Sequence, residues 1–185
     1  MQHPSVLVVV DMQLVAFDGK ITPPINRGQS VLDNTVRLLQ VYRAAGAGIL
    51  YLQTCAMPGR PYSKDQHGWE LHPVLAVRDD EPVVYKLGSS GFEGTDLHTV
   101  LGEMGAQRLV VCGIWSQHCV ANTAFDAAEL GYAVCVAKDA HGTVDADDGA
   151  ADAVVRAQNE GFLARSFEVL DTAEIEAQLS QQPRD

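Results

Sequence analysis

The chain has 185 residues, of which 46% are hydrophobic and 20% are charged. This balance is typical of folded proteins and excludes an intrinsically disordered chain. Because one domain usually takes about 150 residues, the whole chain, residues 1–185, is predicted to form a single domain. Acidic side chains outnumber basic ones by 24 to 13, for a net charge of −11, and the sequence has no basic run. A nucleic acid is therefore not expected as a partner.

The sequence also indicates where the protein acts. Its longest apolar stretch, Val6 to Val10, is too short to cross a bilayer, and its first residues do not read as a secretory signal. We therefore expect a cytoplasmic protein without membrane contact. The four cysteines are spaced neither as a CxxC pair nor as a zinc framework, so we expect reduced thiols. We also expect no cofactor.

Short β-branched and apolar runs recur along the chain, as in strands of a buried parallel sheet. The predicted strands are residues 5–10, 48–52, 82–85, 108–112, 132–136 and 166–170. Helical periodicity lies between them: one helix stops at Gly46, a second is capped by Thr95 and stops at Gly105, and a third is capped by Ser116 and stops at Gly131. The alternation predicts a three-layer α/β/α domain, Rossmann-like, around a mostly parallel six-stranded sheet.

Residues 53–81 interrupt this alternation. Proline and glycine recur through the segment and break up any regular element. A long irregular insert in a compact domain is typically a lid or a binding loop.

Three chemically reactive side chains follow predicted strands. Asp11 follows the first strand, Lys86 the third, and Cys119 comes shortly after the fourth. Ligands bind beyond the carboxyl ends of the strands in open α/β sheets, so these side chains are expected to meet. In the first turn of a helix the Cys119 thiol would have a lowered pKa. Asp11 could then take its proton, and Lys86 could hold that carboxylate in place.

The spacing alone also allows three structural roles. Asp11 could cap a turn, Lys86 could be a solvated lysine at a strand end, and Cys119 could be a packing residue at a helix start. These alternatives remain open until the surrounding residues are considered.

The surrounding residues match an ordered set of motifs. They are Asp11-Met12-Gln13 with Phe17; Lys86 followed by Ser90-Gly91-Phe92-Glu93-Gly94-Thr95-Asp96-Leu97; Gly113-Ile114-Trp115-Ser116-Gln117-His118-Cys119-Val120 with Thr123-Ala124 and Asp126-Ala127; and then Gly131-Tyr132 and Asp139-Ala140. With these motifs, over most of its length, the chain resembles the isochorismatase-like cysteine hydrolases. That superfamily includes nicotinamidase, N-carbamoylsarcosine amidase and streptothricin hydrolase.

The resemblance implies a catalytic triad of Cys119, Asp11 and Lys86 that hydrolyses a non-peptide C–N bond of a small-molecule amide through a thioester on Cys119. It further implies a non-proline cis peptide at Ile114–Trp115 and an oxyanion hole formed by the backbone N–H groups of Trp115 and Cys119. Family members are commonly homo-oligomers, so a dimer or tetramer is expected.

Departures from the family pattern concern metal binding. Nicotinamidases hold a divalent metal through an Asp-x-His motif and a further His, and the segment after Gln53 has no such motif. His67 and His72 with Glu70 do not match a zinc arrangement. Residues 145–149 resemble a calcium loop but lack its later ligands, and an acidic helix start is the better interpretation. We predict no metal.

Four aromatic residues are candidate walls of a substrate pocket: Phe17, Trp69, Phe92 and Trp115. Each could instead pack in the core.

Two alternatives to the amidase also remain. The first is an isochorismatase-type hydrolase of a vinyl ether, whose family members generally lack the nucleophilic cysteine. The second is a non-catalytic thiol sensor, for which Cys112 is the nearest candidate partner of Cys119.

Overall fold

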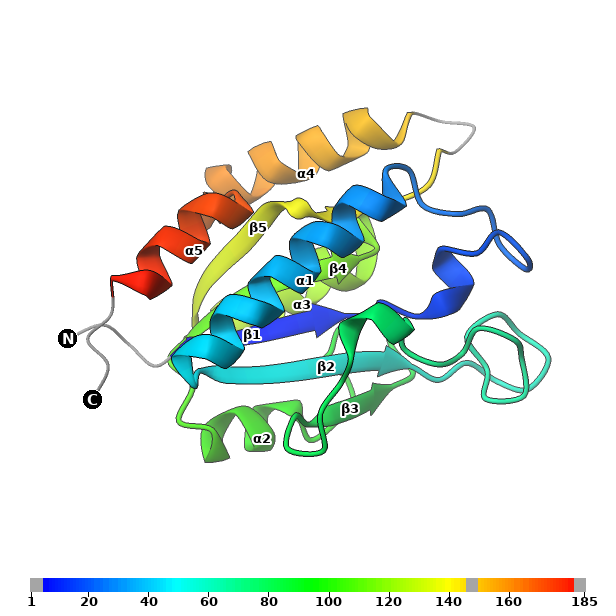
Figure 1. The fold of residues 1–185 in the computed structure, drawn as a ribbon, viewed down its shortest axis with the longest axis horizontal. Coiled ribbons are helices and arrows are strands. Elements are labelled where there is room, and N and C mark those ends of the chain that lie inside the picture. Colours follow the sequence, from blue (N-terminus) through cyan, green and yellow to red (C-terminus); the bar gives the residue numbers. More distant parts are fainter. Residues whose placement is uncertain (1–4, 146–149, 182–185) are drawn as a thin grey trace.

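A computed structural model describes residues 5–145 and 150–181. Six strands form one parallel sheet in the order β3-β2-β1-β4-β5-β6 (Figure 1). The strands are β1 (Ser5–Val10), β2 (Gly48–Thr54), β3 (Val83–Lys86), β4 (Arg108–Ile114), β5 (Ala133–Gly142) and β6 (Glu168–Leu170). The helices are α1 (Gly28–Ala45), α2 (Leu97–Glu103), α3 (Ala121–Glu129), α4 (Ala151–Ala164) and α5 (Thr172–Ser180).

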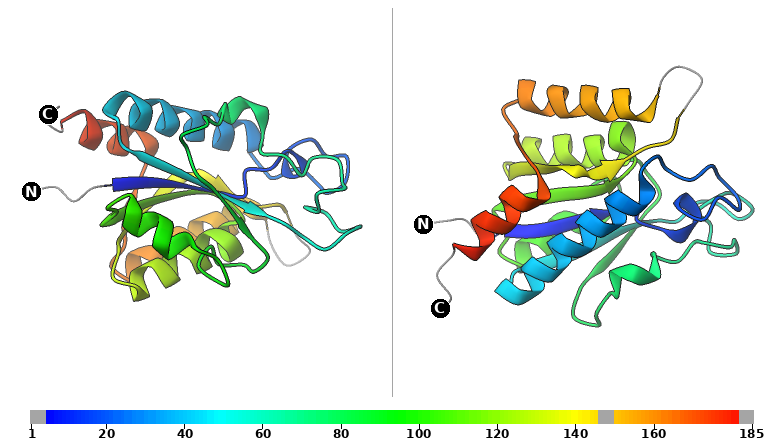
Figure 2. Two further views of the ribbon diagram at one scale, coloured as in Figure 1. Left: turned by 90° about the horizontal axis from the view of Figure 1, so that it is seen from below. Right: turned by 45° about the horizontal axis from the view of Figure 1, so that its top comes forward.

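Helices cover both faces of the sheet, which confirms the predicted three-layer architecture. Helices α1 and α5 lie on one face, and α2, α3 and α4 lie on the other (Figure 2). Alternate residues of each central strand therefore enter different halves of the core. Leu7 and Val9 pack with α1 and α5, whereas Val6, Val8 and Val10 pack with the other three helices.

Strand β5 has 10 residues, five more than the apolar run 132–136 had predicted. Its second half contains Lys138, Asp139 and His141, polar residues that resemble a loop in sequence. A register shift lies between Val111 and Gly113 of β4, and beyond it Gly113 pairs with His141. The bulge lets both strands continue toward the carboxyl edge of the sheet, so His141 comes to lie beside the turn that follows β4.

The insert predicted over residues 53–81 is mostly irregular, but its first two residues belong to β2, Pro73–Leu75 form a short 3-10 helix, and the segment is anchored. Its backbone bonds to the segment after β1: Val15 N–H donates to the Gly68 carbonyl over 2.8 Å, and His72 N–H donates to the Met12 carbonyl over 2.7 Å. At its far end the Glu81 carboxylate, mostly buried, lies 2.7 Å from the Arg43 guanidinium of α1. The first part of the insert and the segment after β1 lie at the carboxyl edge of the sheet, and the insert then returns to the start of β3 (Figure 1). No helix of the described ranges is long and apolar enough to cross a membrane.

Candidate active site

The three predicted catalytic residues meet at the carboxyl edge of the sheet. Asp11 directly follows β1, Lys86 ends β3, and Cys119 lies in the turn after β4. Strand β2 separates β1 from β3, and its last residue, Thr54, pairs with Lys86. The Lys86 side chain therefore crosses the end of β2 to reach Asp11.

Lys86 is the centre of the cluster. Its Nζ lies 2.8 Å from Asp11 Oδ2 and donates to Cys119 Sγ over 3.3 Å. It also donates to Thr54 Oγ1 over 2.9 Å and to the Gly88 carbonyl over 3.1 Å. The Lys86 and Asp11 side chains are 0% and 2% exposed, so the ion pair is shielded from water. An ammonium that contacts both a carboxylate and a thiol can stabilise negative charge on either of them.

A close approach of β1 and β4 brings Asp11 beside the cysteine turn. Gly113 pairs with Val10 in the register of these strands. Its φ is +116°, and a Cβ at this position would lie 2.1 Å from the Val10 carbonyl oxygen. A side chain here would force the strands apart, so the position requires glycine.

The turn that carries Cys119 is a π-turn, Ser116–Val120, that leads into α3. It begins after a cis peptide between Ile114 and Trp115, as the resemblance predicted. Among the described residues, the Trp115 carbonyl accepts from the N–H groups of His118 and Val120 and skips Cys119. An ordinary α-turn would have used the Cys119 N–H for this bond. The Trp115 carbonyl is therefore not the partner of the Cys119 N–H, and the oxyanion hole stays a prediction.

Ser116 does not cap this helix, which corrects the prediction. The N-cap position belongs to Trp115 and has no side-chain cap bond. Instead, Ser116 Oγ lies 2.8 Å from Nδ1 of His141 on β5. A hydroxyl that bonds sideways to a neighbouring strand cannot also turn back onto the helix N–H groups.

The predicted lowering of the Cys119 pKa is also wrong. Burial raises the pKa of the thiol and the Asp11 charge raises it further, and these effects outweigh the opposing charge of Lys86. Burial likewise raises the pKa of Asp11, although Lys86 opposes it. Burial alone would lower the pKa of Lys86, but the charges of Asp11 and Cys119 hold it above its ordinary value. The resting site therefore holds a neutral thiol beside a carboxylate that is more basic than usual.

The four predicted aromatic residues divide between different surroundings. Phe17 and Trp115 pack against the same half of the core, and the Phe17 ring meets His72 edge-on at 5.3 Å. Phe92 packs against the other half, where its ring stacks on Tyr132 at 6.1 Å. Trp69 donates from Nε1 to the Thr54 carbonyl over 3.2 Å. A substrate-binding role for all four stays a prediction.

Tyr62 is a site residue that the sequence did not reveal. It lies in the irregular insert with a left-handed φ of 69°. Burial raises its pKa, and the charges of Asp11 and Cys119 raise it further, which places the phenol within electrostatic reach of both. No pattern in the insert points to a tyrosine at this position. The neutral hydroxyl is a candidate hydrogen-bond donor to a substrate.

Gln13 appeared in the family motif without a role, and the structure supplies one. Its fully buried amide donates to the Thr54 carbonyl over 3.0 Å and to the Trp69 carbonyl over 2.7 Å. Its oxygen accepts from the Thr54 N–H over 3.0 Å. Because Thr54 contacts Lys86, Gln13 fixes one wall of the triad to the insert. A lone amide within the apolar stretch after Asp11 is the signal that could have identified it.

The residues of the insert do not fit the metal site of the nicotinamidases. His67 Nε2 lies 2.6 Å from Asp18 Oδ2, whereas His72 Nδ1 accepts from the Val74 N–H. Within residues 5–145 and 150–181, no three His, Cys, Asp or Glu side chains group closely enough to hold a metal ion. Of the calcium-like sequence, residues 146–149 lie outside the described residues. Asp145 accepts from the Ala151 N–H at the start of α4 over 2.8 Å.

Comparison with known families agrees with this geometry. The model of the isochorismatase domain matches residues 5–174. The chain belongs to the isochorismatase family. Two streptothricin hydrolases of Streptomyces noursei are 40% and 38% identical to it, over 75% and 83% of this chain. The matches cover 50% and 61% of those relatives, so the chain spans little more than half their length.

A solved structure extends the likeness to the whole fold. The crystal structure of a cysteine hydrolase from Pseudomonas syringae superposes with a TM-score of 0.89. It is 26% identical, and the match covers 96% of this chain and 92% of the other. The predicted α/β architecture is confirmed.

Proposed function

We propose that this isochorismatase-family protein hydrolyses the C–N bond of a small-molecule amide through a thioester on Cys119. The observation that carries the proposal is the position of Lys86 Nζ, 2.8 Å from Asp11 Oδ2 and 3.3 Å from Cys119 Sγ. One buried cation thus bridges a general base and a nucleophile.

The reaction begins with transfer of the thiol proton from Cys119 to Asp11, and Sγ then attacks the substrate carbonyl carbon. The resulting oxyanion faces the backbone N–H groups of Trp115 and Cys119. Collapse of this intermediate breaks the C–N bond, and the leaving amine takes the proton from Asp11. Water next gives a proton to Asp11 and attacks the thioester. The acid is released, and the thiolate recovers its proton from Asp11.

Charge near the thiol favours a neutral substrate. Lys86 is the cation within hydrogen-bond distance of Cys119 Sγ, and its partners already include Asp11 and Thr54. A substrate carboxylate would have to compete for that ammonium. A neutral amide needs only the two N–H groups and the thiol.

The thiol-sensor alternative fits the geometry poorly. Cys112 is fully buried in the half of the core that packs with α1 and α5. Cys119 packs against the opposite half of the core. A disulfide between them requires their Cα atoms to lie within about 7 Å and their side chains to point at each other, which these opposite orientations oppose.

The test is turnover of small amides, including a streptothricin and nicotinamide, followed by release of amine or ammonia. We expect Cys119→Ala to abolish turnover and Cys55→Ala, at a cysteine outside the triad, to retain it. Intact-protein mass spectrometry should trap the acyl group on wild-type protein during turnover. Amide turnover that survives Cys119→Ala would refute the thioester. Turnover of a vinyl ether by both variants would favour the isochorismatase-type reaction.

The expected homo-oligomer stays a prediction, which sedimentation velocity tests directly. Strand β3 is an edge of the sheet, and Tyr85 and Leu87 at its end are 53% and 82% exposed. Exposed apolar side chains on an edge strand are a suitable surface for self-association.

A further inference from the structure

His141 is a buried, titratable residue that the proposed reaction does not use. It is 2% exposed and lies near the end of β5, opposite Gly113 in the register with β4. Its ring makes two polar contacts, 2.8 Å from Nδ1 to Ser116 Oγ and 2.9 Å from Nε2 to Asn159 Oδ1. Three elements are joined in this way: the cysteine turn, β5 and α4.

The hydrogen-bond partners determine where the protons lie. Asn159 Nδ2 donates to the Lys138 carbonyl over 3.2 Å, so its Oδ1 is the atom that faces His141. An amide oxygen can only accept, so His141 Nε2 carries a hydrogen. Burial lowers the pKa of His141, and the Asn159 bond and the Asp139 charge oppose this only in part. The ring is therefore neutral, its Nδ1 is bare, and Ser116 donates to it.

We propose that neutral His141, oriented by Asn159, is a positioning residue that holds the Cys119 turn through the Ser116 hydroxyl. This inference rests on the proposed acyl transfer at Cys119. Ser116 is the first residue of the π-turn, and the N–H groups of Trp115 and Cys119 lie on either side of it in sequence. Fixing Ser116 to β5 sets the direction in which those N–H groups point.

The thiol itself is held from the other side. Cys119 Sγ contacts Lys86 Nζ at 3.3 Å and Ser89 Oγ at 4.0 Å, and both residues belong to β3 or the segment after it. Loss of the Ser116–His141 bond should therefore disturb the oxyanion hole more than the thiol. This separation makes the role measurable, because acyl transfer needs an oxyanion hole and alkylation by iodoacetamide does not.

Two substitutions of His141 separate its two bonds. In His141→Asn the amide oxygen takes the place of Nδ1 and can accept from Ser116. In His141→Gln the amide nitrogen takes the place of Nε2 and can donate to Asn159, but the acceptor for Ser116 is lost. Ser116→Ala removes the same bond from the other end, and Ser116→Thr retains it.

We expect His141→Gln and Ser116→Ala each to slow acylation of Cys119 by p-nitrophenyl acetate about 10- to 100-fold, the effect of a misplaced oxyanion donor. His141→Asn and Ser116→Thr should lose less than about fivefold. Alkylation of Cys119 by iodoacetamide should change less than about twofold in all four. In the double variant Ser116→Ala/His141→Gln the losses should not multiply, because one bond is removed twice.

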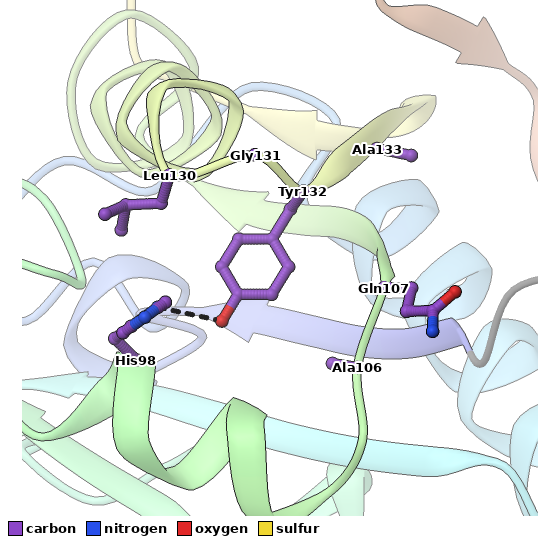
Figure 3. Close-up of a pocket in the computed structure, with 7 residues that line it drawn as sticks. All are labelled: His98, Ala106, Gln107, Leu130, Gly131, Tyr132 and Ala133. Carbon is purple, nitrogen blue, oxygen red and sulfur yellow. Dashed lines mark hydrogen bonds between the residues drawn. The ribbon is translucent and has the colours of Figure 1, made fainter.

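The chain offers a matched control at the opposite edge of the sheet. His98 Nδ1 lies 2.9 Å from the Tyr132 hydroxyl, in a surface hollow of about 470 Å³ formed where α2, α3 and the start of β5 meet (Figure 3). This is also an imidazole–hydroxyl pair, but it has no contact with the triad. His98→Gln removes it and should leave acylation at the wild-type rate.

Nitrogen NMR of the imidazole supplies a readout that needs no substrate. Two-bond ¹⁵N–¹H spectra should show His141 protonated at Nε2 alone, with an Nδ1 shift that changes in Ser116→Ala. Protonation at Nδ1, equal losses in the asparagine and glutamine variants, or parallel losses of acylation and alkylation would each overturn the inference. If no amide is turned over but this pattern holds with p-nitrophenyl acetate, the substrate class is wrong and the positioning role stands.

Discussion

Removing the charge of Lys86 should slow the reaction of Cys119 with iodoacetamide about tenfold at pH 8. The ammonium lies 3.3 Å from Sγ. At an effective dielectric constant of about 20, two unit charges at this distance attract by about 5 kcal/mol. Asp11 competes for the same ammonium, so we take about half of this as stabilising the thiolate. Without the Lys86 charge the thiolate is more basic and therefore more nucleophilic, which offsets roughly half of that stabilisation. About 1.3 kcal/mol is left, a tenfold change in rate.

The substitution Lys86→Met keeps most of the side-chain volume and removes the charge. Asp11→Asn should act in the opposite direction, because the Asp11 charge raises the pKa of the thiol. In that variant the Cys119 thiolate replaces the carboxylate as partner of Lys86, and alkylation at pH 8 should be faster. The double variant Asp11→Asn/Lys86→Met leaves no unpaired buried charge, so it should fold even where a single variant does not.

The assay is alkylation at a series of pH values, with each cysteine followed by peptide mass spectrometry. Burial raises the pKa of Cys112 and of Cys135 to about 12, so both should stay unmodified and report any unfolding. Wild-type Cys119 should be only slowly modified at neutral pH. Modification that is unchanged or faster in Lys86→Met, or slower in Asp11→Asn, would refute this account of the thiol.

Three further predictions concern Gln13, Tyr62 and Glu81. Gln13→Leu removes the acceptor of the Thr54 N–H, whereas the Thr54 carbonyl keeps its bond from Trp69. It should lower the free energy of unfolding in urea by about 1–2 kcal/mol; a loss below about 0.5 kcal/mol would contradict the clamp. Tyr62→Phe should raise KM about tenfold without altering alkylation of Cys119; a changed melting temperature with an unchanged KM would make the hydroxyl structural. Although burial opposes it, bonding to Arg43 lowers the pKa of Glu81. Stability from that pair is thus present above the ordinary carboxyl range and lost as pH falls through the lowered pKa. Glu81→Gln should cost about 1–2 kcal/mol at pH 7, and this gap from wild type should shrink in acid; a gap independent of pH would contradict the ion pair.

The sequence predicted the sheet and the meeting of Asp11, Lys86 and Cys119 because both depend on local patterns. Continuous β-branched runs such as Val6 to Val10 have few conformations other than a buried strand. In a parallel sheet all carboxyl ends lie at one edge, so a reactive residue after each of several strands is brought to one place. Asp11, Lys86 and Cys119 met for this reason, although their order in the sheet was not predicted.

The parts that the sequence did not predict depend on distances between segments. The second half of β5 is polar, and it pairs with β4 only because a bulge shifts the register. A π-turn adds one residue to an ordinary helix start and leaves the apolar pattern of α3 almost unchanged. The loops that carry Phe17 and Phe92 determine which half of the core each ring faces. The sign of the Cys119 pKa shift follows from burial and from the nearby Asp11 charge, and neither is visible in a linear motif.

A raised thiol pKa is compatible with nucleophilic catalysis at this site. The pKa of Asp11 is raised as well, so its carboxylate is a stronger proton acceptor than a free carboxylate. Lys86 contacts both groups, and transfer of the proton only moves the negative charge from one of its neighbours to the other. Lys86 therefore offsets part of the cost of forming the thiolate. The raised pKa keeps the Cys119 thiol protonated in the resting site, and a protonated thiol resists oxidation.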